Sequence, residues 1–268
     1  MSLYKKTFNG LKKKKQGALV AFTVIGDPNY NTSLQIIRKM IDSGADILEL
    51  GLPFSDPIAD GKTIQAADMR ALKAGINTDK CFQLIKHIRK YNNKIPVGLL
   101  VYGNLIYQRG INKFYSDAKK VGVNSILVAD VPIEESGDYI KAAKSNKVDT
   151  VFIVSPLTSN ERIKEIAGKT TGFVYVVSRL GVTGAKATLQ DSTLKLIKRI
   201  RKYTKKPLCV GFGISKPEHV RSVIKAGADG AIVGSAVVDL IEKNANNRAK
   251  ILKKIGFYLE SMKKATEN

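Results

Sequence analysis

Short apolar runs alternate with longer amphipathic segments along the whole chain. Each run is about five residues long and apolar at nearly every position, which is typical of parallel strands that are covered on both faces. The pattern predicts eight buried strands. They span residues 18–24, 46–50, 96–101, 125–129, 150–154, 173–177, 207–211 and 230–233.

The segments between these runs carry apolar residues at the 3.6-residue period of an α-helix. Two of them end in Gly-Ala-Asp, at 44–46 and 227–229, where the glycine can adopt the left-handed conformation that closes a helix. These two copies resemble an internal repeat of one strand–helix unit. Helices are predicted at 3–15, 33–43, 81–91, 111–121, 134–145, 160–167, 194–203, 216–226 and 248–263.

Repeated strand–helix units without a proline- or serine-rich linker predict an α/β fold. We expect residues 1–268 to form a single (β/α)8 TIM barrel with an extra helix before the first strand. The length suits one such barrel, which typically takes about 250 residues. A doubly wound open sheet is the alternative, because periodicity alone does not show whether a sheet closes.

The chain is strongly basic, with 45 Lys and Arg against 23 Asp and Glu and a net charge of +22. Such a charge suggests nucleic acid or an anionic membrane as a partner. The lysines, however, occur in nearly every predicted helix, and the only dense run is at 12–15. Only 10 of the 45 basic residues are arginine and tryptophan is absent, whereas nucleic-acid sites favour clustered Arg and stacking aromatics. We therefore expect no nucleic-acid partner.

The two cysteines, Cys81 and Cys209, lie in a helical pattern and an apolar run, so we expect both to be small buried side chains. Residues 1–15 lack the apolar core of a signal peptide, and no run approaches the roughly 18 apolar residues of a membrane span. These observations favour a cytoplasmic location without a membrane partner.

Catalytic residues of such a barrel lie at the carboxyl ends of its strands. Glu49 is a carboxylate inside an apolar run, on the same face of the predicted strand as Ile47. If that face lines the barrel, burial raises the pKa of Glu49 into the range useful for general acid–base catalysis. A buried glutamate paired with a nearby lysine is the alternative.

The loop that follows, residues 51–61, contains Asp56 and Asp60 between prolines and glycines. Long loops after barrel strands are seldom kept for packing alone. Glu49 and Asp60 at one barrel mouth could move two protons in one reaction. The alternative for Asp60 is a helix cap for a helix that begins near Thr63.

Three glycine-rich turns follow consecutive strands, at 178–185, 211–215 and 234–236. Their backbone N–H groups can approach a phosphate closely, and Gly234 with Ser235 would open a short helix whose amino end favours an anion. This is the common phosphate position of barrel enzymes, so a phosphorylated small substrate is predicted, with plain turn geometry as the alternative.

The residues needed for two other kinds of catalysis, Schiff-base formation and metal-assisted catalysis, are not found at suitable positions. No lysine stands at a strand end, so a Schiff-base aldolase has no nucleophile. His87 and His219 fall in helical patterns without ligands at suitable spacing, so no metal site is expected.

The stretch Glu-Leu-Gly-Leu-Pro-Phe-Ser-Asp-Pro-Ile-Ala-Asp-Gly at 49–61 closely resembles the signature of tryptophan synthase α subunits. Gly-Asp-Pro at 26–28 and the turns at 178–184, 211–215 and 234–236 match the same family in order and spacing. The resemblance extends over essentially the whole chain. It implies cleavage of indole-3-glycerol phosphate to indole and glyceraldehyde 3-phosphate in tryptophan biosynthesis, a retro-aldol lyase step without metal or cofactor in this chain.

The resemblance also implies roles for individual residues. Glu49 matches the general acid–base that acts at indole C3 and at the side-chain hydroxyl, and Asp60 matches the carboxylate at the indole N–H. The remaining matches form the phosphate site (Gly184, Gly213, Gly234 and Ser235), a loop that closes over substrate (Arg179 and Thr183), the apolar indole wall (Phe22, Leu100, Leu127, Tyr175 and Phe212) and the rim (Tyr102).

Finally, the resemblance implies a partner, a pyridoxal-phosphate-dependent β subunit in an αββα complex that receives indole through a tunnel. The contact surface would comprise 53–60, 102–110 and 130–135, and Asp56 would be an interface or loop-positioning residue rather than a third catalyst. Two other hypotheses remain. A different indole or sugar-phosphate barrel enzyme would need a catalytic Lys or a Cys/Asp pair, and a basic binding protein would have lost catalysis.

Overall fold

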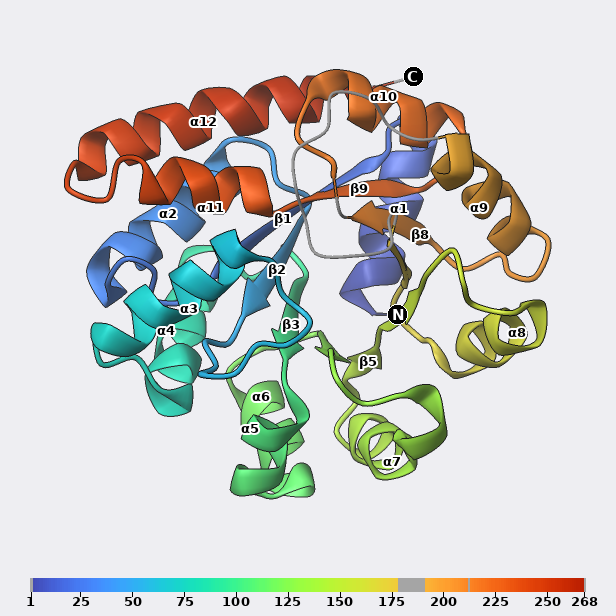
Figure 1. Cartoon of the computed structure of the whole chain (residues 1–268), viewed down its shortest axis with the longest axis horizontal. Coiled ribbons are helices and arrows are strands. Elements are labelled where there is room, and N and C mark those ends of the chain that lie inside the picture. Colours follow the sequence, from blue (N-terminus) through green and yellow to red (C-terminus); the bar gives the residue numbers. More distant parts are fainter. Residues whose placement is uncertain (1, 178–190, 212, 268) are drawn as a thin grey trace.

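The strands form one parallel sheet that closes into a barrel (Figure 1). The computed structural model describes residues 2–177, 191–211 and 213–267. The sheet order is β5-β4-β3-β2-β1-β9-β8-β7-β6, and its two end strands, β5 and β6, are separated in the chain only by Val151. At this junction Val151 N–H donates to Ile126 O at 3.3 Å and Gly172 N–H donates to Thr150 O at 3.0 Å. The fifth strand therefore bonds to both neighbours, which excludes the open doubly wound sheet.

The eight predicted runs are confirmed as strands, with the fifth divided into two halves. The division arises because its first half pairs with β4 and its second half pairs with β7. The bounds are β1 Ala18–Val24, β2 Ile47–Gly51, β3 Val97–Val101, β4 Ser125–Val128, β5 Asp149–Thr150, β6 Phe152–Val154, β7 Val174–Val177, β8 Leu208–Gly211 and β9 Gly230–Val233.

Helices surround the strands in Figure 1. The predicted helix at 134–145 is in fact a 3₁₀ turn, η1, and a helix, α7, because Ser136 Oγ donates to Ile133 O at 2.6 Å and ends the first turn. The bounds are α1 Leu3–Lys13, α2 Tyr30–Asp42, α3 Lys62–Lys73, α4 Thr78–Tyr91, α5 Gly103–Arg109, α6 Ile111–Lys120, η1 Ile133–Glu135, α7 Gly137–Ser145, α8 Asn160–Lys169, α9 Asp191–Arg201, α10 Pro217–Lys225, α11 Ser235–Glu242 and α12 Arg248–Lys264.

The barrel interior and the layer between strands and helices form two apolar clusters. Alternate strand residues such as Val20, Ile47 and Tyr175 point inward, and α1 adds Tyr4 to this inner cluster. Tyr4 also shares a 2.7 Å hydrogen bond with Ser125 Oγ. Because side chains alternate along a strand, the face of β2 that presents Ile47 to the interior also presents Glu49 there.

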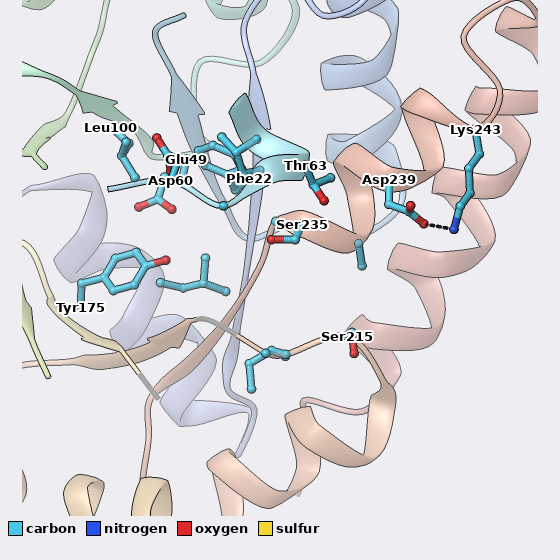
Figure 2. A pocket seen from close by; sticks show the side chains of 17 residues that line it. Phe22, Glu49, Asp60, Thr63, Leu100, Tyr175, Ser215, Ser235, Asp239 and Lys243 are labelled. Atoms are coloured by element: carbon cyan, nitrogen blue, oxygen red, sulfur yellow. Dashed lines mark hydrogen bonds and ion pairs between the residues drawn. The ribbon is translucent and has the colours of Figure 1, made fainter. Parts of the chain in front are cut away.

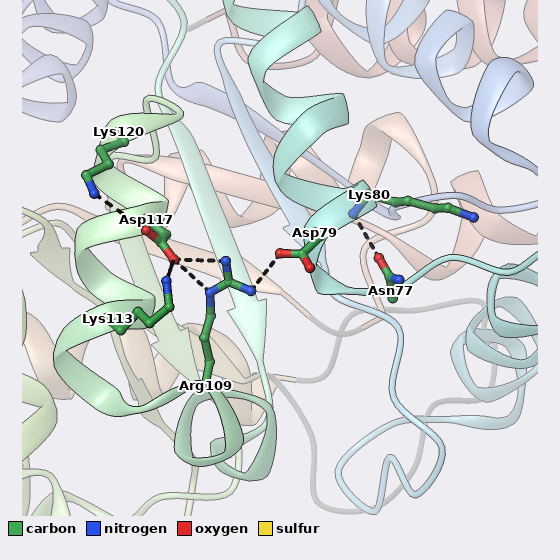
Figure 3. A network of polar contacts seen from close by, with 7 residues as sticks. All are labelled: Asn77, Asp79, Lys80, Arg109, Lys113, Asp117 and Lys120. Atoms are coloured by element: carbon green, nitrogen blue, oxygen red, sulfur yellow. Dashed lines mark hydrogen bonds and ion pairs between the residues drawn. The ribbon is translucent and has the colours of Figure 1, made fainter.

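The short helix α5 is held by an ionic network at its carboxyl end (Figure 3). Arg109 lies 2.7 Å from Asp79 of α4 and 2.8 Å from Asp117 of α6, and its guanidinium stacks over the Phe82 ring. One arginine thus joins three helices, which fixes a helix too short to be stable by itself.

No helix in the described part of the chain combines the length and hydrophobicity needed to cross a membrane. Cys81 and Cys209 are free and buried, as predicted, and burial raises the pKa of both thiols.

Candidate active site

A cavity of about 370 Å³ opens where β1, β2, β8 and β9 end (Figure 2). The segments that follow β2, β8 and β9 supply much of its wall, so it lies at the carboxyl ends of the strands. Its lining consists of Phe22, Glu49, Asp60, Gly61, Thr63, Ile64, Leu100, Tyr175, Gly213, Ile214, Ser215, Ile232, Gly234, Ser235, Ala236, Asp239 and Lys243.

Glu49 is a nearly buried acid, only 4% exposed. Its Oε2 has no hydrogen-bond partner among the described residues, which does not support the alternative of a lysine-paired structural glutamate. Burial, and then the negative charge of Asp60, raises the pKa of Glu49 to about 8. Glu49 is therefore protonated at neutral pH and can act as an acid.

Asp60 is held by Tyr102, whose hydroxyl donates to Asp60 Oδ2 at 2.7 Å. The same hydroxyl accepts the Ala59 N–H at 3.1 Å. Burial raises the pKa of Asp60, and the hydrogen bond from Tyr102 opposes part of that rise. The cap of α3 is Gly61, without a side-chain hydrogen bond, so the helix-cap interpretation of Asp60 is wrong.

Three other side chains of the 51–61 loop, those of Phe54, Asp56 and Ile58, do not line the cavity. Phe54 stacks on the Tyr102 ring with centroids 5.0 Å apart. Asp56 accepts a 2.5 Å hydrogen bond from Ser55 Oγ and does not line the cavity. Ile58 is 81% exposed. The loop thus presents one carboxylate inward and an apolar side chain outward.

Phe22 forms one wall of the cavity because two glycines leave room for its ring. A Cβ atom at Gly51 would lie 3.0 Å from Phe22 Cζ, and one at Gly234 would lie 3.0 Å from Phe22 Cδ1. Leu100 and Tyr175 also line the cavity. Leu127, predicted for the same wall, lies deeper in the inner cluster and borders a second cavity of about 320 Å³.

The glycine-rich side of the cavity contains Gly213, Gly234 and Ser235 as predicted. Gly213 has a φ of +81°, a conformation that favours glycine. Ser235 is the first residue of α11, and the first backbone N–H groups of a helix have no carbonyl partner within the helix, so this wall suits an anion. The predicted Arg179, Thr183, Gly184 and Phe212 lie outside the described residues.

The family model described as "Tryptophan synthase alpha chain" matches residues 8–267. The chain belongs to the tryptophan synthase α-chain family. The α chain of Methanothermobacter thermautotrophicus is 52% identical over 238 residues, which are 89% of this chain and 88% of that relative. The α chain of Escherichia coli O1:K1 is 44% identical over 268 residues, with full coverage of both.

Solved structures agree with this family assignment. The tryptophan synthase α2β2 complex of Pyrococcus furiosus contains a chain with a TM-score of 0.86 and 39% identity, covering 92% of this chain and 98% of that one. Tryptophan synthase subunit α of Legionella pneumophila has a TM-score of 0.91 and 32% identity, covering 99% of this chain and 98% of its own. The predicted resemblance and fold are confirmed.

Several residues that line the cavity were not predicted from the sequence. In the sequence, Ile64 and Ile232 cannot be distinguished from ordinary apolar core residues of a helix and a strand. Asp239 of α11 and Lys243, the residue directly after this helix, form a 2.7 Å ion pair and line the cavity. The available signal was the spacing of Ser235, Asp239 and Lys243, which follow one another at four-residue intervals and would share one helix face.

Proposed function

We propose that this chain cleaves indole-3-glycerol phosphate to indole and glyceraldehyde 3-phosphate, as the α subunit of a tryptophan synthase. One observation supports this most strongly. A buried acid whose Oε2 has no hydrogen-bond partner among the described residues, Glu49, and a carboxylate held by a tyrosine, Asp60, face one cavity whose opposite wall suits a phosphate. A retro-aldol reaction on an indole needs these two groups.

The substrate would lie across the cavity. Its phosphate would accept hydrogen bonds from backbone N–H groups at Gly213, Gly234 and Ser235, where the amino end of α11 favours an anion. Its indole ring would pack against Phe22 and Leu100. This orientation directs the reacting carbon toward Glu49.

In the first step, protonated Glu49 donates its proton to indole C3. Protonation interrupts the aromatic system and places positive charge at the ring nitrogen. Asp60 accepts a hydrogen bond from that N–H and stabilises the charge electrostatically. The Tyr102 hydroxyl holds Asp60 in place for this role.

In the second step, the Glu49 carboxylate removes the proton of the hydroxyl on the carbon attached to C3. The carbon–carbon bond breaks, its electron pair restores the indole ring, and the oxygen becomes the aldehyde of glyceraldehyde 3-phosphate. Glu49 regains its proton, so the cycle needs no other reactant. The roles of Arg179, Thr183, Gly184 and Phe212 remain predictions from the family resemblance.

We infer that the partner is a β subunit in an αββα complex, which carries the pyridoxal phosphate and receives the indole. The solved Pyrococcus furiosus relative is described as an α2β2 complex. In this chain, the surface predicted to contact the partner exposes apolar side chains, with Ile58 81% and Tyr107 71% exposed. Exposed apolar side chains such as these suit a protein interface. Two free buried cysteines suit the reducing cytoplasm, where we place the reaction.

The test is an assay of the purified chain with indole-3-glycerol phosphate, alone and with a β subunit. Equal amounts of indole and glyceraldehyde 3-phosphate are expected. If neither product is formed, even with the β subunit present, the proposed function is wrong. A different barrel enzyme would consume the substrate without releasing indole.

A further inference from the structure

The amino end of α5 is not capped by its own N-cap residue. That residue is Tyr102, whose side chain makes no capping hydrogen bond. N-cap residues are usually Ser, Thr, Asp or Asn, because their side chains accept a hydrogen bond from the first turn of the helix. The Tyr102 hydroxyl instead donates to Asp60, at 2.7 Å. The side chain at the N-cap position is thus engaged with a residue of the cavity.

Asp130, in the segment after β4, supplies a cap from another part of the chain. Its Oδ1 accepts the Gly103 N–H, the first of α5, at 2.7 Å. The first N–H groups of a helix have no carbonyl partner within it, so Asp130 satisfies one of them. A Cβ atom at Gly103 would lie 3.0 Å from Val131 Cγ2 and 3.4 Å from Asp130 Oδ1. The segment after β4 therefore packs directly on the peptide group that joins Tyr102 to Gly103.

A continuous set of contacts joins Asp130 to the proposed catalytic pair. The N–H that Asp130 binds belongs to the peptide group between Tyr102 and Gly103. At the other end of the same tyrosine, the hydroxyl donates to Asp60 Oδ2 and accepts the Ala59 N–H at 3.1 Å. Asp60 lines the proposed active site, whereas Asp130 borders the second cavity. The contacts thus lead from Asp130 through Tyr102 to Asp60.

We propose that Asp130 is a positioning residue for the lyase reaction, which caps α5 in place of Tyr102 and so holds Tyr102 where its hydroxyl fixes Asp60. The proposal rests on the proposed function, because the position of Asp60 matters only if Asp60 stabilises charge on the substrate. Asp130 touches no substrate and transfers no proton.

Two substitutions of Asp130 separate the loss of the cap from the loss of a charge. Asp130→Asn keeps an acceptor oxygen, whereas Asp130→Ala removes it. We expect Asp130→Ala to lower kcat about fivefold with KM nearly unchanged, since the glycine-rich wall is untouched. Asp130→Asn should restore kcat to within about twofold of wild type. Because Asp130 is exposed, neither variant leaves a buried charge, and both should fold.

The Tyr102→Phe background tests whether Asp130 acts through the Tyr102 hydroxyl. That hydroxyl is absent in Tyr102→Phe, so adding Asp130→Ala should lower kcat by less than about twofold further. In the wild-type background, Asp130→Ala should move the acidic limb of the kcat–pH profile to higher pH. The reason is that a weaker hydrogen bond from Tyr102 opposes less of the rise that burial produces in the pKa of Asp60.

Hydrogen exchange of the Ala59 amide gives a readout that does not depend on turnover. Its N–H donates to the Tyr102 hydroxyl, so exchange should be faster in Asp130→Ala and in Tyr102→Phe, and near wild type in Asp130→Asn. Asp138→Ala removes an exposed carboxylate from the first turn of α7 and is the control, which should change neither kcat nor Ala59 exchange.

Steady-state kinetics and hydrogen exchange on the full chain therefore test the inference. Kinetics are measured at saturating β subunit, because residues 130–135 belong to the surface predicted for that partner. The inference is overturned if Asp130→Ala keeps wild-type kcat and Ala59 exchange, or if it lowers kcat by the same factor with and without the Tyr102 hydroxyl. A wild-type chain without turnover would instead refute the proposed function, while Ala59 exchange would still report whether Asp130 holds Tyr102.

Discussion

The Tyr102 hydroxyl donates a 2.7 Å hydrogen bond to Asp60, a residue 42 positions earlier in the chain. Tyr102 follows β3 and Asp60 ends the loop after β2, so the pair connects two neighbouring strand ends. Its consequence is electrostatic. The hydrogen bond opposes the rise that burial produces in the pKa of Asp60 and so favours the ionised carboxylate that the mechanism needs.

Tyr102→Phe removes this hydrogen bond with little change in shape. The pKa of Asp60 should rise further, so the acidic limb of the kcat–pH profile should move to higher pH. At neutral pH we expect kcat to fall about tenfold, as for loss of a hydrogen bond to a charged group. The control is Tyr91→Phe, which removes a 2.7 Å hydrogen bond to Asp42 on the surface. Equal pH profiles for wild type and Tyr102→Phe would contradict this role.

Glu49 should make the folded chain less stable as pH rises. Its folded pKa of about 8 lies above the ordinary 4.5, so between these values the native state binds a proton that the unfolded state has lost. Between these pH values, Glu49 should therefore lower the free energy of unfolding by about 1.4 kcal/mol for each unit by which the pH rises. Urea unfolding at pH 5 and pH 8 should show a smaller loss for Glu49→Gln than for wild type. Glu260→Gln, on the surface of α12, is the control, and identical pH dependence in all three proteins would refute the burial argument.

Gly234→Ala should weaken phosphate binding. The added methyl would lie 3.0 Å from Phe22 Cδ1 and 3.2 Å from Phe22 Cβ, so the wall must shift beside the proposed phosphate site. We expect KM to rise about tenfold, with a smaller effect on kcat. Calorimetry with glycerol phosphate measures the same loss directly. Gly168→Ala is the matched control, because its added Cβ would meet no atom within 4 Å outside its own stretch of helix. If Gly234→Ala bound glycerol phosphate as tightly as wild type, this anion site would be excluded.

A charge at the exposed tip of the 51–61 loop should impair assembly. Ile58→Asp places a carboxylate on the apolar surface proposed for the β subunit and should reduce affinity for that subunit about tenfold or more. Phe257→Asp, at a 63% exposed position on α12, should leave affinity near wild type. Surface-binding measurements with immobilised β subunit distinguish them. Equal affinity for wild type and Ile58→Asp would place the interface elsewhere.

Hydrophobic periodicity predicted the strands, because each buried strand gives a continuous apolar run, but only the pairing of the strands showed that the sheet closes. The periodic segments did not include α3 or α11, for which only the first residues were expected, and they did not include α5. Helix α5 has seven residues, of which only Gly103 and Ile106 are buried. That helix depends on contacts of Arg109 with α4 and α6, which no local pattern encodes. The division at Ser136 likewise depends on one side-chain hydrogen bond.

The candidate site was predictable where strand geometry determines it. The period-2 alternation placed Glu49 inside the barrel, and the glycine turns indicated the opposite wall. The Tyr102–Asp60 hydrogen bond depends on how the 51–61 loop folds against β3, and so does the lack of a hydrogen-bond partner for Glu49 Oε2 among the described residues. Loop conformation follows from tertiary packing, so sequence reasoning left the helix-cap alternative for Asp60 open.

The most direct test of the account is indole release from indole-3-glycerol phosphate by wild-type chain and by Glu49→Gln, each with and without the β subunit. Glutamine keeps the shape of Glu49 but can neither donate a proton to C3 nor accept the hydroxyl proton. We predict that the variant binds substrate with similar affinity and loses at least about a hundredfold in kcat. Turnover by Glu49→Gln at a rate near wild type would contradict the central claim that this buried acid performs the cleavage.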